Sequence, residues 1–382
     1  MQTGNKQNYT PRQRVQDAMD LRTPDRVPLM CQLSIGHMLL QLGVSPLEFW
    51  HDAVVFAEGL LHLREIYNFD GILVSLHGHN PDWARKIETR SVIGGVEEVI
   101  WRNGERFRYL SDDLPQPMNP AGRHPVLREF DESELPSTLE YIPVSQGLHF
   151  EIDSLHRFEV FRQIRSRMGN TFSVHGEITS PFDYFLDLFG YQEGLLGLLS
   201  EPDRCKSILA HFSSLVKDLA IEMCAEGVDA IKVSSPFAGA GFISVDAYRE
   251  FVLPYESEIA EAVRDRGVHI YTHTCGAVSD RLELMFDAGV SGIECLDPPP
   301  LGDVELEDAK RRTKGRGFIK GNIDSVNMLL NGHPAEILAD ARRRLEVGKA
   351  GGGYILSTAC SVAPRVDRTK LLLLLEAVQT WG

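Results

Sequence analysis

Short apolar runs rich in β-branched residues alternate along the chain with helix-length stretches whose apolar residues recur on one face. The apolar runs that we predict to be strands are residues 27–30, 69–76, 172–177, 227–235, 267–275, 289–297, 315–324 and 351–359. Such alternation is typical of parallel strands joined by crossover helices. A count of eight strands favours an α/β fold of the (β/α)8 type, a TIM barrel, over an open sheet.

A long segment interrupts this alternation after the second predicted strand. The stretch VEEVIWRNGERFRYL (96–110) predicts a β-hairpin closed by Asn103-Gly104, a pair that suits a tight hairpin turn. A proline-rich loop and a polar stretch with two short helices follow. We interpret residues of about 86–160 as an insertion over the barrel mouth. The whole chain, 1–382, is then one domain with an N-terminal helical segment at 1–25.

Composition limits the classes of function. With 43% hydrophobic residues the chain can bury a large core, and its net charge of −15 disfavours nucleic acid or an anionic membrane as a partner. No apolar run is long enough to span a bilayer, and the first residues are polar. We therefore expect a cytoplasmic protein, whose scattered cysteines are buried residues, metal ligands or catalytic thiols instead of disulfides.

Candidate chemistry gathers where the predicted strands end, because the carboxyl ends of barrel strands form the active site in this fold. The polar residues at these ends are His77, His79, His175, Glu177, Ser234, Ser235, His273, Cys275, Glu294, Asp297, Asn322, Asp324, Ser357, Thr358 and, just beyond the last strand, Cys360.

His273 and Cys275 are two residues apart, so on an extended strand both side chains point to the same side. Cys360 follows the last strand and can reach the same rim. One imidazole and two thiolates leave one coordination position free, the open arrangement of catalytic zinc. A second interpretation stays open, in which the cysteines are inert buried residues and the histidine is a satisfied core residue.

Four short stretches spread over nearly the whole chain are informative when taken in order: Thr23-Pro-Asp-Arg-Val-Pro28, Phe251-Val-Leu-Pro-Tyr255, Gly321-Asn-Ile-Asp324 and Ala363-Pro-Arg-Val366. Together they resemble the uroporphyrinogen decarboxylase superfamily. One branch of that superfamily consists of cobamide-dependent methyltransferases, which carry His-x-Cys on strand five and a cysteine after strand eight as zinc ligands. His273, Cys275 and Cys360 match those positions, so the resemblance implies a zinc site.

The chain departs from the decarboxylase branch at three places. Residues 30–35 read Met-Cys-Gln-Leu-Ser-Ile, where the decarboxylase has an arginine-containing run that holds its acidic substrate. His77 stands where the decarboxylase has its essential aspartate, and Cys360 stands where it has a histidine. A substrate with eight carboxylates needs cationic partners, because unpaired buried carboxylates are costly. The resemblance thus favours the methyltransferase branch.

We therefore expect an enzyme that moves a methyl group between a corrinoid (cobalamin) protein and a small molecule. The small molecule is a thiol, tetrahydrofolate or a methoxylated aromatic compound, the last by O-demethylation. No cobalamin-binding motif is visible in the chain, so a partner protein has to supply the corrinoid, and we expect a monomer or homodimer. A metal-free decarboxylase of tetrapyrrole metabolism and a non-catalytic corrinoid- or tetrapyrrole-binding protein remain as alternatives.

Roles follow for the other strand-end residues. We expect Glu177 to be the fourth zinc ligand and to share the catalytic role with His273, Cys275 and Cys360. The residues that we expect to contact the substrate are His77, His79, His175, Tyr184, Ser235 and Asn322.

Overall fold

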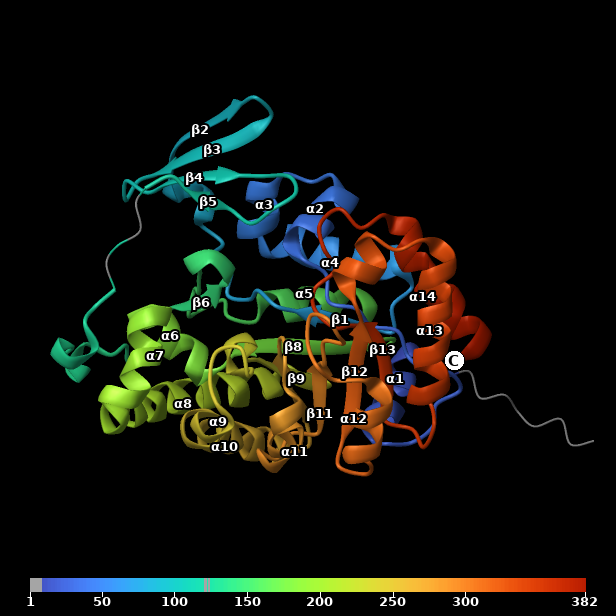
Figure 1. Cartoon of the computed structure of the whole chain (residues 1–382). Coiled ribbons are helices and arrows are strands. Elements are labelled where there is room, and N and C mark those ends of the chain that lie inside the picture. Colours follow the sequence, from blue (N-terminus) through green and yellow to red (C-terminus); the bar gives the residue numbers. More distant parts are fainter. Residues whose placement is uncertain (1–8, 120–121, 123) are drawn as a thin grey trace, which may run out of the picture.

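The computed structural model describes residues 9–119, 122 and 124–382. Its centre is a curled, seven-stranded parallel sheet with the order β1-β8-β9-β10-β11-β12-β13 (Figure 1). The strands of this sheet are β1 (Gly71–Val74), β8 (Ser173–Thr179), β9 (Ala230–Ser234), β10 (His269–Thr274), β11 (Gly292–Cys295), β12 (Phe318–Ile323) and β13 (Tyr354–Thr358). Strands that are neighbours in this order also follow one another in the chain, as expected for repeated strand–helix units.

Two isolated bridges close the sheet into a barrel. Leu29 pairs in parallel with Leu356 of β13, and Leu33 pairs with Val362. On the other side, the N–H of Asp70, just before β1, donates to the carbonyl of Leu29 over 2.9 Å. The predicted (β/α)8 barrel is confirmed, but residues 27–30 form a bridge instead of a regular strand. Pro28 has no N–H to donate to a ladder, which limits regular pairing there.

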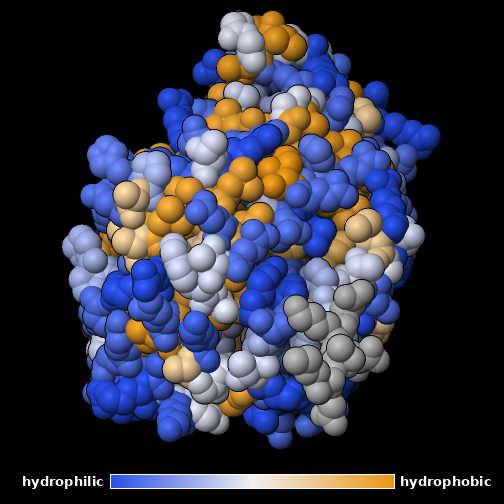
Figure 2. Space-filling view, turned by 90° about the vertical axis from the view of Figure 1, so that its right-hand side faces the viewer, coloured by the Kyte–Doolittle hydropathy of each residue, from blue (hydrophilic) through white to orange (hydrophobic). Residues whose placement is uncertain are grey.

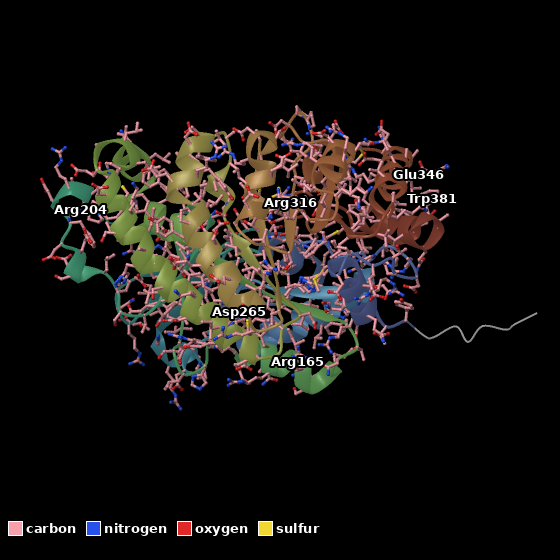
Figure 3. The ribbon with its side chains drawn as sticks, turned by 90° about the horizontal axis from the view of Figure 1, so that it is seen from below. Arg165, Arg204, Asp265, Arg316, Glu346 and Trp381 are labelled. Atoms are coloured by element: carbon pink, nitrogen blue, oxygen red, sulfur yellow. The ribbon has the colours of Figure 1, made fainter. Side chains whose placement is uncertain are left out.

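Helices cover the outside of the barrel. They are α1 (Pro11–Met19), α2 (Ile35–Leu42), α3 (Pro46–His51), α4 (Ala53–Tyr67), α5 (Glu159–Met168), α6 (Pro181–Phe189), α7 (Tyr191–Ser200), α8 (Pro202–Ala225), α9 (Val245–Phe251), α10 (Leu253–Arg264), α11 (Leu282–Asp287), α12 (Leu306–Arg312), α13 (Pro334–Gly348) and α14 (Arg368–Trp381). Seen from below, α8 and α10 lie on the outside of the strands, with Asp265 just after α10 and Glu346 near the end of α13 (Figure 3). Among the described residues, no helix combines the length and apolar character needed to cross a bilayer.

The interior of the barrel is layered. At the amino ends of the strands, the buried apolar side chains include Ala230, Tyr271, Phe318 and Ile355. Helix α1 contacts β1, β8 and β13 and closes this end. We call the end of the barrel at the carboxyl ends of the strands the mouth. The next layer toward the mouth is charged. It contains the buried Lys232, which is aligned with Glu177 on β8.

The insertion lies between β1 and α5 and stands out at one side of the mouth (Figure 1). It holds the antiparallel sheet β2 (Ile87–Ile93), β3 (Val96–Trp101), β4 (Arg106–Tyr109) and β5 (Gln116–Pro117), and the ribbon β6 (Tyr141–Val144) and β7 (Leu148–Glu151). The predicted hairpin is β3–β4, with Gly104 at φ +87° in its turn. The imidazole of His51 bonds to the Tyr109 hydroxyl over 2.8 Å and ties the insertion to α3.

Polar side chains predominate over much of the face shown in Figure 2, and hydrophobic ones are interspersed mainly across its upper part. This mixture suits a chain with a net charge of −15.

Candidate metal centre

Three potential metal ligands meet at the mouth of the barrel. His273 lies on β10, Cys275 follows that strand, and Cys360 follows β13. The Cys275 Sγ is 3.3 Å from the His273 Nε2 and 3.9 Å from the Cys360 Sγ, and all three ligand atoms lie within 4.8 Å of one another. Tetrahedral zinc with ordinary bond lengths separates two sulfurs by about 3.8 Å and a sulfur and a nitrogen by about 3.6 Å. The donor set therefore fits zinc in both chemistry and spacing.

Local structure explains why Cys275 points into this group. Gly276 has φ +76°, which lets the chain turn away directly after the cysteine. The N–H of Gly276 donates to Asp297 Oδ2 over 2.7 Å, and the N–H of Val278 donates to Asp303 over 2.9 Å. These two bonds attach the loop after β10 to the loop after β11, so the position of Cys275 is fixed from both sides.

The second ring nitrogen of His273 is held by a carboxylate. Its Nδ1 is 3.0 Å from Glu294 Oε2, and both residues are buried. An imidazole that donates Nδ1–H to a carboxylate keeps its Nε2 lone pair for a metal. Glu294 is aligned with His273 across β10 and β11, which becomes visible only when the strand register is known.

Two buried lysines balance the charge of the carboxylates. The Lys320 ammonium pairs with Glu294 Oε1. The Lys232 ammonium lies 3.4 Å from Glu294 Oε2, 3.2 Å from Glu177 Oε1 and 2.7 Å from the Gln32 side-chain oxygen. Sequence reasoning missed both lysines. The available signal was a lysine inside an apolar strand, which requires a buried partner because an unpaired buried charge is strongly unfavourable.

Hydrogen bonds adjust the protonation of the thiols. Bonds from Cys295 and Cys360 lower the pKa of Cys275 to about 5, although burial acts in the opposite direction. The pKa of Cys360 is raised, first by its bond with Cys275 and then by burial. Burial alone raises the pKa of Glu294, but Lys320 and Lys232 outweigh it and hold that pKa well below its usual range. The centre thus presents a thiolate at neutral pH, the form that binds metals.

A third cysteine, also missed from the sequence, lies beside the group. The buried Cys295 thiol donates to Asp297 Oδ2 over 3.3 Å, and the ligand atoms of Cys275, Cys295 and Asp297 lie within 4.8 Å of one another. Cys295 and the next residue, Leu296, have φ of +85° and +55°. Two consecutive residues with side chains in this region are unusual and are held there by their surroundings.

Glu177, the predicted fourth ligand, lies in the charged layer, where it is aligned with Lys232 on the neighbouring strand. Its Oε1 pairs with Lys232, and its buried Oε2 has no hydrogen-bond partner among the residues that the structure describes. It does not belong to the group of atoms within 4.8 Å. His175, two residues earlier, uses both ring nitrogens within the protein, at 3.0 Å from the Tyr271 hydroxyl and 3.1 Å from the Ser173 hydroxyl.

The two histidines after β1 are buried under the insertion among aromatic rings. The ring of His77 lies near Phe158, and that of His79 lies 4.8 Å from Phe150, centroid to centroid. Within the described part of the chain, the ring nitrogens of both histidines have no hydrogen-bond partner. Burial lowers the pKa of His77 to about 4 and that of His79 to about 3, so both are neutral at pH 7.

The remaining three predicted substrate residues are also buried. The Tyr184 hydroxyl donates to the carbonyl of Tyr141 over 2.8 Å. The Asn322 amide donates to the Leu296 carbonyl over 2.8 Å, and its oxygen accepts from an arginine of α13. The Ser235 hydroxyl has no hydrogen-bond partner in the part of the chain that the structure describes.

Comparison with known proteins assigns the family. The family described as uroporphyrinogen decarboxylase (URO-D) matches residues 139–381, more than half of the chain. The protein therefore belongs to the uroporphyrinogen decarboxylase family, in agreement with the resemblance found in its sequence.

Its similarity to individual proteins is low but extends over the full length in two cases. Methylcobamide:CoM methyltransferase MtbA of Methanosarcina acetivorans is 24% identical over 385 residues, covering 98% of each chain. The protein of the same description from Methanosarcina mazei is 22% identical over 379 residues, again covering 98% of each. Uroporphyrinogen decarboxylase of Chlorobium phaeobacteroides is 29% identical over 187 residues, 47% of this chain and 50% of that protein.

Solved structures support the fold. A methyltransferase from Methanosarcina mazei superposes with a TM-score of 0.71 at 18% identity, covering 98% of this chain and 99% of that one. A B12-independent methionine synthase from a Shewanella species superposes with a TM-score of 0.53 at 14% identity, covering 93% and 97%. At such identities the likeness establishes the fold alone, and the chemistry has to be argued from the site.

Proposed function

We propose that this protein is a zinc-dependent methyltransferase that moves a methyl group between a corrinoid protein and a small substrate. The observation that carries the proposal is the convergence of His273 Nε2, Cys275 Sγ and Cys360 Sγ within 4.8 Å. Cys360 comes from a part of the chain distant from His273 and Cys275, and the three donors leave one position of a tetrahedron free. A catalytic zinc site needs that free position, and a structural site does not.

The relatives point in the same direction. Two relatives that match over almost the whole chain are described as methylcobamide:CoM methyltransferases, whereas the match to the Chlorobium phaeobacteroides decarboxylase covers about half. The cations inside the barrel argue against a substrate with many carboxylates, since Lys232 and Lys320 are already paired with Glu177 and Glu294. Methyl transfer therefore explains the donor set better than decarboxylation does.

Each residue of the centre has a definite task in this proposal. Zinc, when bound, supplies a Lewis acid that makes a coordinated thiol a thiolate at neutral pH. Cys275 and Cys360 give two thiolates, and His273 gives its Nε2. Glu294 accepts the Nδ1–H of His273 and so holds the imidazole in the orientation and tautomer that a metal requires. Glu177 is the proposed fourth ligand when no substrate is present.

The substrate thiolate would attack the methyl group on cobalt(III) of a corrinoid protein docked at the mouth, so that a carbon–sulfur bond forms while the methyl–cobalt bond breaks and its electron pair stays on cobalt(I). A thiol is the acceptor that a soft sulfur-rich metal site suits best, while tetrahydrofolate and a methoxylated aromatic compound remain the other candidates. Proposed substrate contacts are His77, His79 and Ser235, whose buried polar atoms have no partner among the described residues. His175, Tyr184 and Asn322 already bond to protein groups and support the walls of the site.

We place the protein in the cytoplasm, as a monomer or homodimer, with the corrinoid supplied by its partner. In support, each of its six cysteines is a free thiol in the structure, and reducing conditions keep them so.

Two measurements on the purified full-length protein test the function. We expect about one zinc per chain, and transfer of the methyl group from methylcobalamin to 2-mercaptoethanesulfonate, followed as loss of the methyl–cobalt absorbance. The control is the same protein after removal of zinc with a chelator, which should be inactive until zinc is restored. Absence of zinc together with conversion of uroporphyrinogen would replace the proposal by decarboxylation, and tight corrinoid binding without turnover would replace it by a binding role.

A further inference from the structure

Lys232 lies between two carboxylates of the charged layer and is fully buried. Its ammonium is 3.2 Å from Glu177 Oε1 and 3.4 Å from Glu294 Oε2. The amide oxygen of Gln32, at 2.7 Å, is its third partner. A buried ammonium with three oxygen partners is well compensated, so the position of Lys232 is defined by these groups.

The two carboxylates differ in how much they depend on Lys232. Glu294 also pairs with Lys320 and bonds to His273, so it keeps charged partners when Lys232 is absent. Among the described residues, Glu177 makes no ion pair except that with Lys232, and its Oε2 has no hydrogen-bond partner there. The location of the Glu177 carboxylate is thus controlled by one side chain.

Charge counting shows what happens at a loaded centre. A divalent metal balances the two thiolates of Cys275 and Cys360, and the lysines Lys232 and Lys320 balance the two glutamates. Removing the Lys232 charge leaves one excess buried negative charge on Glu177. An unpaired buried charge is strongly unfavourable, and binding to the metal would compensate the Glu177 carboxylate. Carboxylate oxygen is a normal ligand of zinc, so Glu177 then binds the metal more strongly.

We propose that Lys232 is a positioning residue that competes with the metal for the Glu177 carboxylate, so that the substrate thiol can displace Glu177 from the fourth coordination position. The inference rests on the proposed function, because it presumes a metal on His273, Cys275 and Cys360. Lys232 touches neither metal nor substrate in this account. It acts through Glu177, whose aligned position on the neighbouring strand β8 brings the two side chains together.

The test compares Lys232→Met, Glu177→Gln and the double variant in the full-length protein. Zinc affinity is measured by competition with a chelating dye. Affinity for 2-mercaptoethanesulfonate is measured in the cobalt(II)-substituted protein from the sulfur-to-cobalt charge-transfer absorbance. We expect Lys232→Met to hold zinc at least as tightly as the wild type, but to bind the thiol about 10- to 100-fold more weakly. Adding Glu177→Gln should restore thiol affinity to within about threefold of the wild type.

Lys320→Met is the matched control, because it removes the other buried cation of the same layer without touching Glu177. Its effect on thiol affinity should not be repaired by Glu177→Gln. Lys232→Arg keeps the charge and should bind thiol nearly as well as the wild type. If Lys232→Met does not fold, Glu177→Gln alone decides: it should bind the thiol at least as tightly as the wild type, and a loss of affinity would overturn the inference.

The outcomes separate this inference from the function beneath it. A wild-type protein without zinc overturns both. A zinc-containing wild type in which Lys232→Met weakens zinc and thiol together, with no repair by Glu177→Gln, overturns only the role of Lys232.

Discussion

The two ends of the barrel differ in how completely their buried carboxylates are paired. At the amino end, Asp70 is buried and accepts hydrogen bonds from Arg14 at 2.6 Å, from Arg26 at 2.9 Å and from the N–H of Leu29 at 2.8 Å. Asp229, just before β9, accepts in the same way from Arg12 at 2.8 Å and from the N–H of Val174 at 2.9 Å. Each carboxylate at this end is fully compensated by the protein itself.

At the mouth, several buried polar groups are not fully paired within the protein and can bind a metal ion or a ligand. His273 Nε2 and the sulfurs of Cys275 and Cys360 contact one another. Glu177 Oε2 and the hydroxyl of Ser357 have no partner within the described residues. The difference teaches that burial of charge does not identify a site. Among the carboxylates compared here, it is Glu177 at the mouth, where enzymes of this fold carry their chemistry, that keeps an unpartnered oxygen within the described residues.

The strongest test of this difference removes the metal ligands. Alanine at His273, Cys275 or Cys360 should reduce zinc from about one per chain to almost none, because two remaining donors bind zinc weakly. Metal analysis by mass spectrometry checks this. Cys205→Ala, at a buried cysteine of α8, is the control and should keep its zinc. Full zinc content in all three ligand variants would end the assignment of the mouth as a metal centre.

A substitution at the amino end should lower the stability of the protein and leave its metal content unchanged. Asp70→Asn leaves Arg14 and Arg26 without their shared carboxylate and should lower the free energy of unfolding by about 3–5 kcal/mol. Denaturant unfolding followed by circular dichroism gives this value, and metal analysis of the folded variant should still find the wild-type zinc content. Loss of zinc from folded Asp70→Asn would show that the two ends are not independent.

Glu256 on α10, behind β10, offers a test by pH. Burial raises its pKa from the ordinary 4.5 to about 7, while the hydrogen bond from the Thr272 hydroxyl acts in the opposite direction. The folded state then keeps a proton that the unfolded state releases, so stability falls as pH rises from about 4.5 to about 7, by about 3 kcal/mol in total. Glu256→Gln removes this loss.

The measurement is the free energy of unfolding of wild type and Glu256→Gln at pH 5 and pH 8. Because pH 5 lies above the unfolded pKa of 4.5, we expect the variant to gain about 2.5 kcal/mol relative to the wild type between the two pH values. If the free energies of unfolding of the wild type and Glu256→Gln differed by the same amount at pH 5 and pH 8, the Glu256 carboxylate would be compensated as completely as that of Asp70. Such a result would weaken the contrast between the amino end and the mouth of the barrel.

The smallest expected effect concerns the carboxylate behind His273. Glu294→Gln keeps the shape of the side chain but removes the charge that orients the imidazole, and it should weaken zinc binding about 10- to 100-fold. Competition with a chelating dye measures the change. Glu283→Gln, which affects an ion pair with Arg312 on the outside of the barrel, should leave zinc affinity unchanged. Unchanged affinity in Glu294→Gln would remove Glu294 from the centre.

The sequence predicts the parts of this structure that depend on local pattern. Alternation of apolar runs and amphipathic stretches predicts the barrel, and the two-residue spacing of His273 and Cys275 predicts that they share a side of β10. Neither the apolar alternation nor the spacing of His273 and Cys275 predicts which residues of neighbouring strands are aligned. The alignment of Glu294 with His273 and of Lys232 with Glu177 arises only when neighbouring strands pair, so this charged layer could not be predicted.

Other differences have equally physical causes. Residues 27–30 have the composition of a strand but make only bridges, since Pro28 cannot donate to a ladder. The histidines at strand ends look alike in sequence, yet the ring of His175 is tied to Tyr271 and Ser173, and that of His79 is enclosed by aromatic side chains. Tertiary packing decides which histidine faces a ligand. The position of a histidine at the end of a strand does not reveal this packing.

The bridges that close the barrel also set the order in which the centre can be assembled during synthesis. They join residues near the start of the chain, Leu29 and Leu33, to Leu356 and Val362 near its end, and Cys360 lies between those last two. A growing chain on the ribosome can form the strands up to β12 but has neither a closed barrel nor a complete ligand set. Closing this long-range contact is slow compared with local folding. The proposed ligand set of His273, Cys275 and Cys360 is therefore complete only after synthesis has passed Cys360.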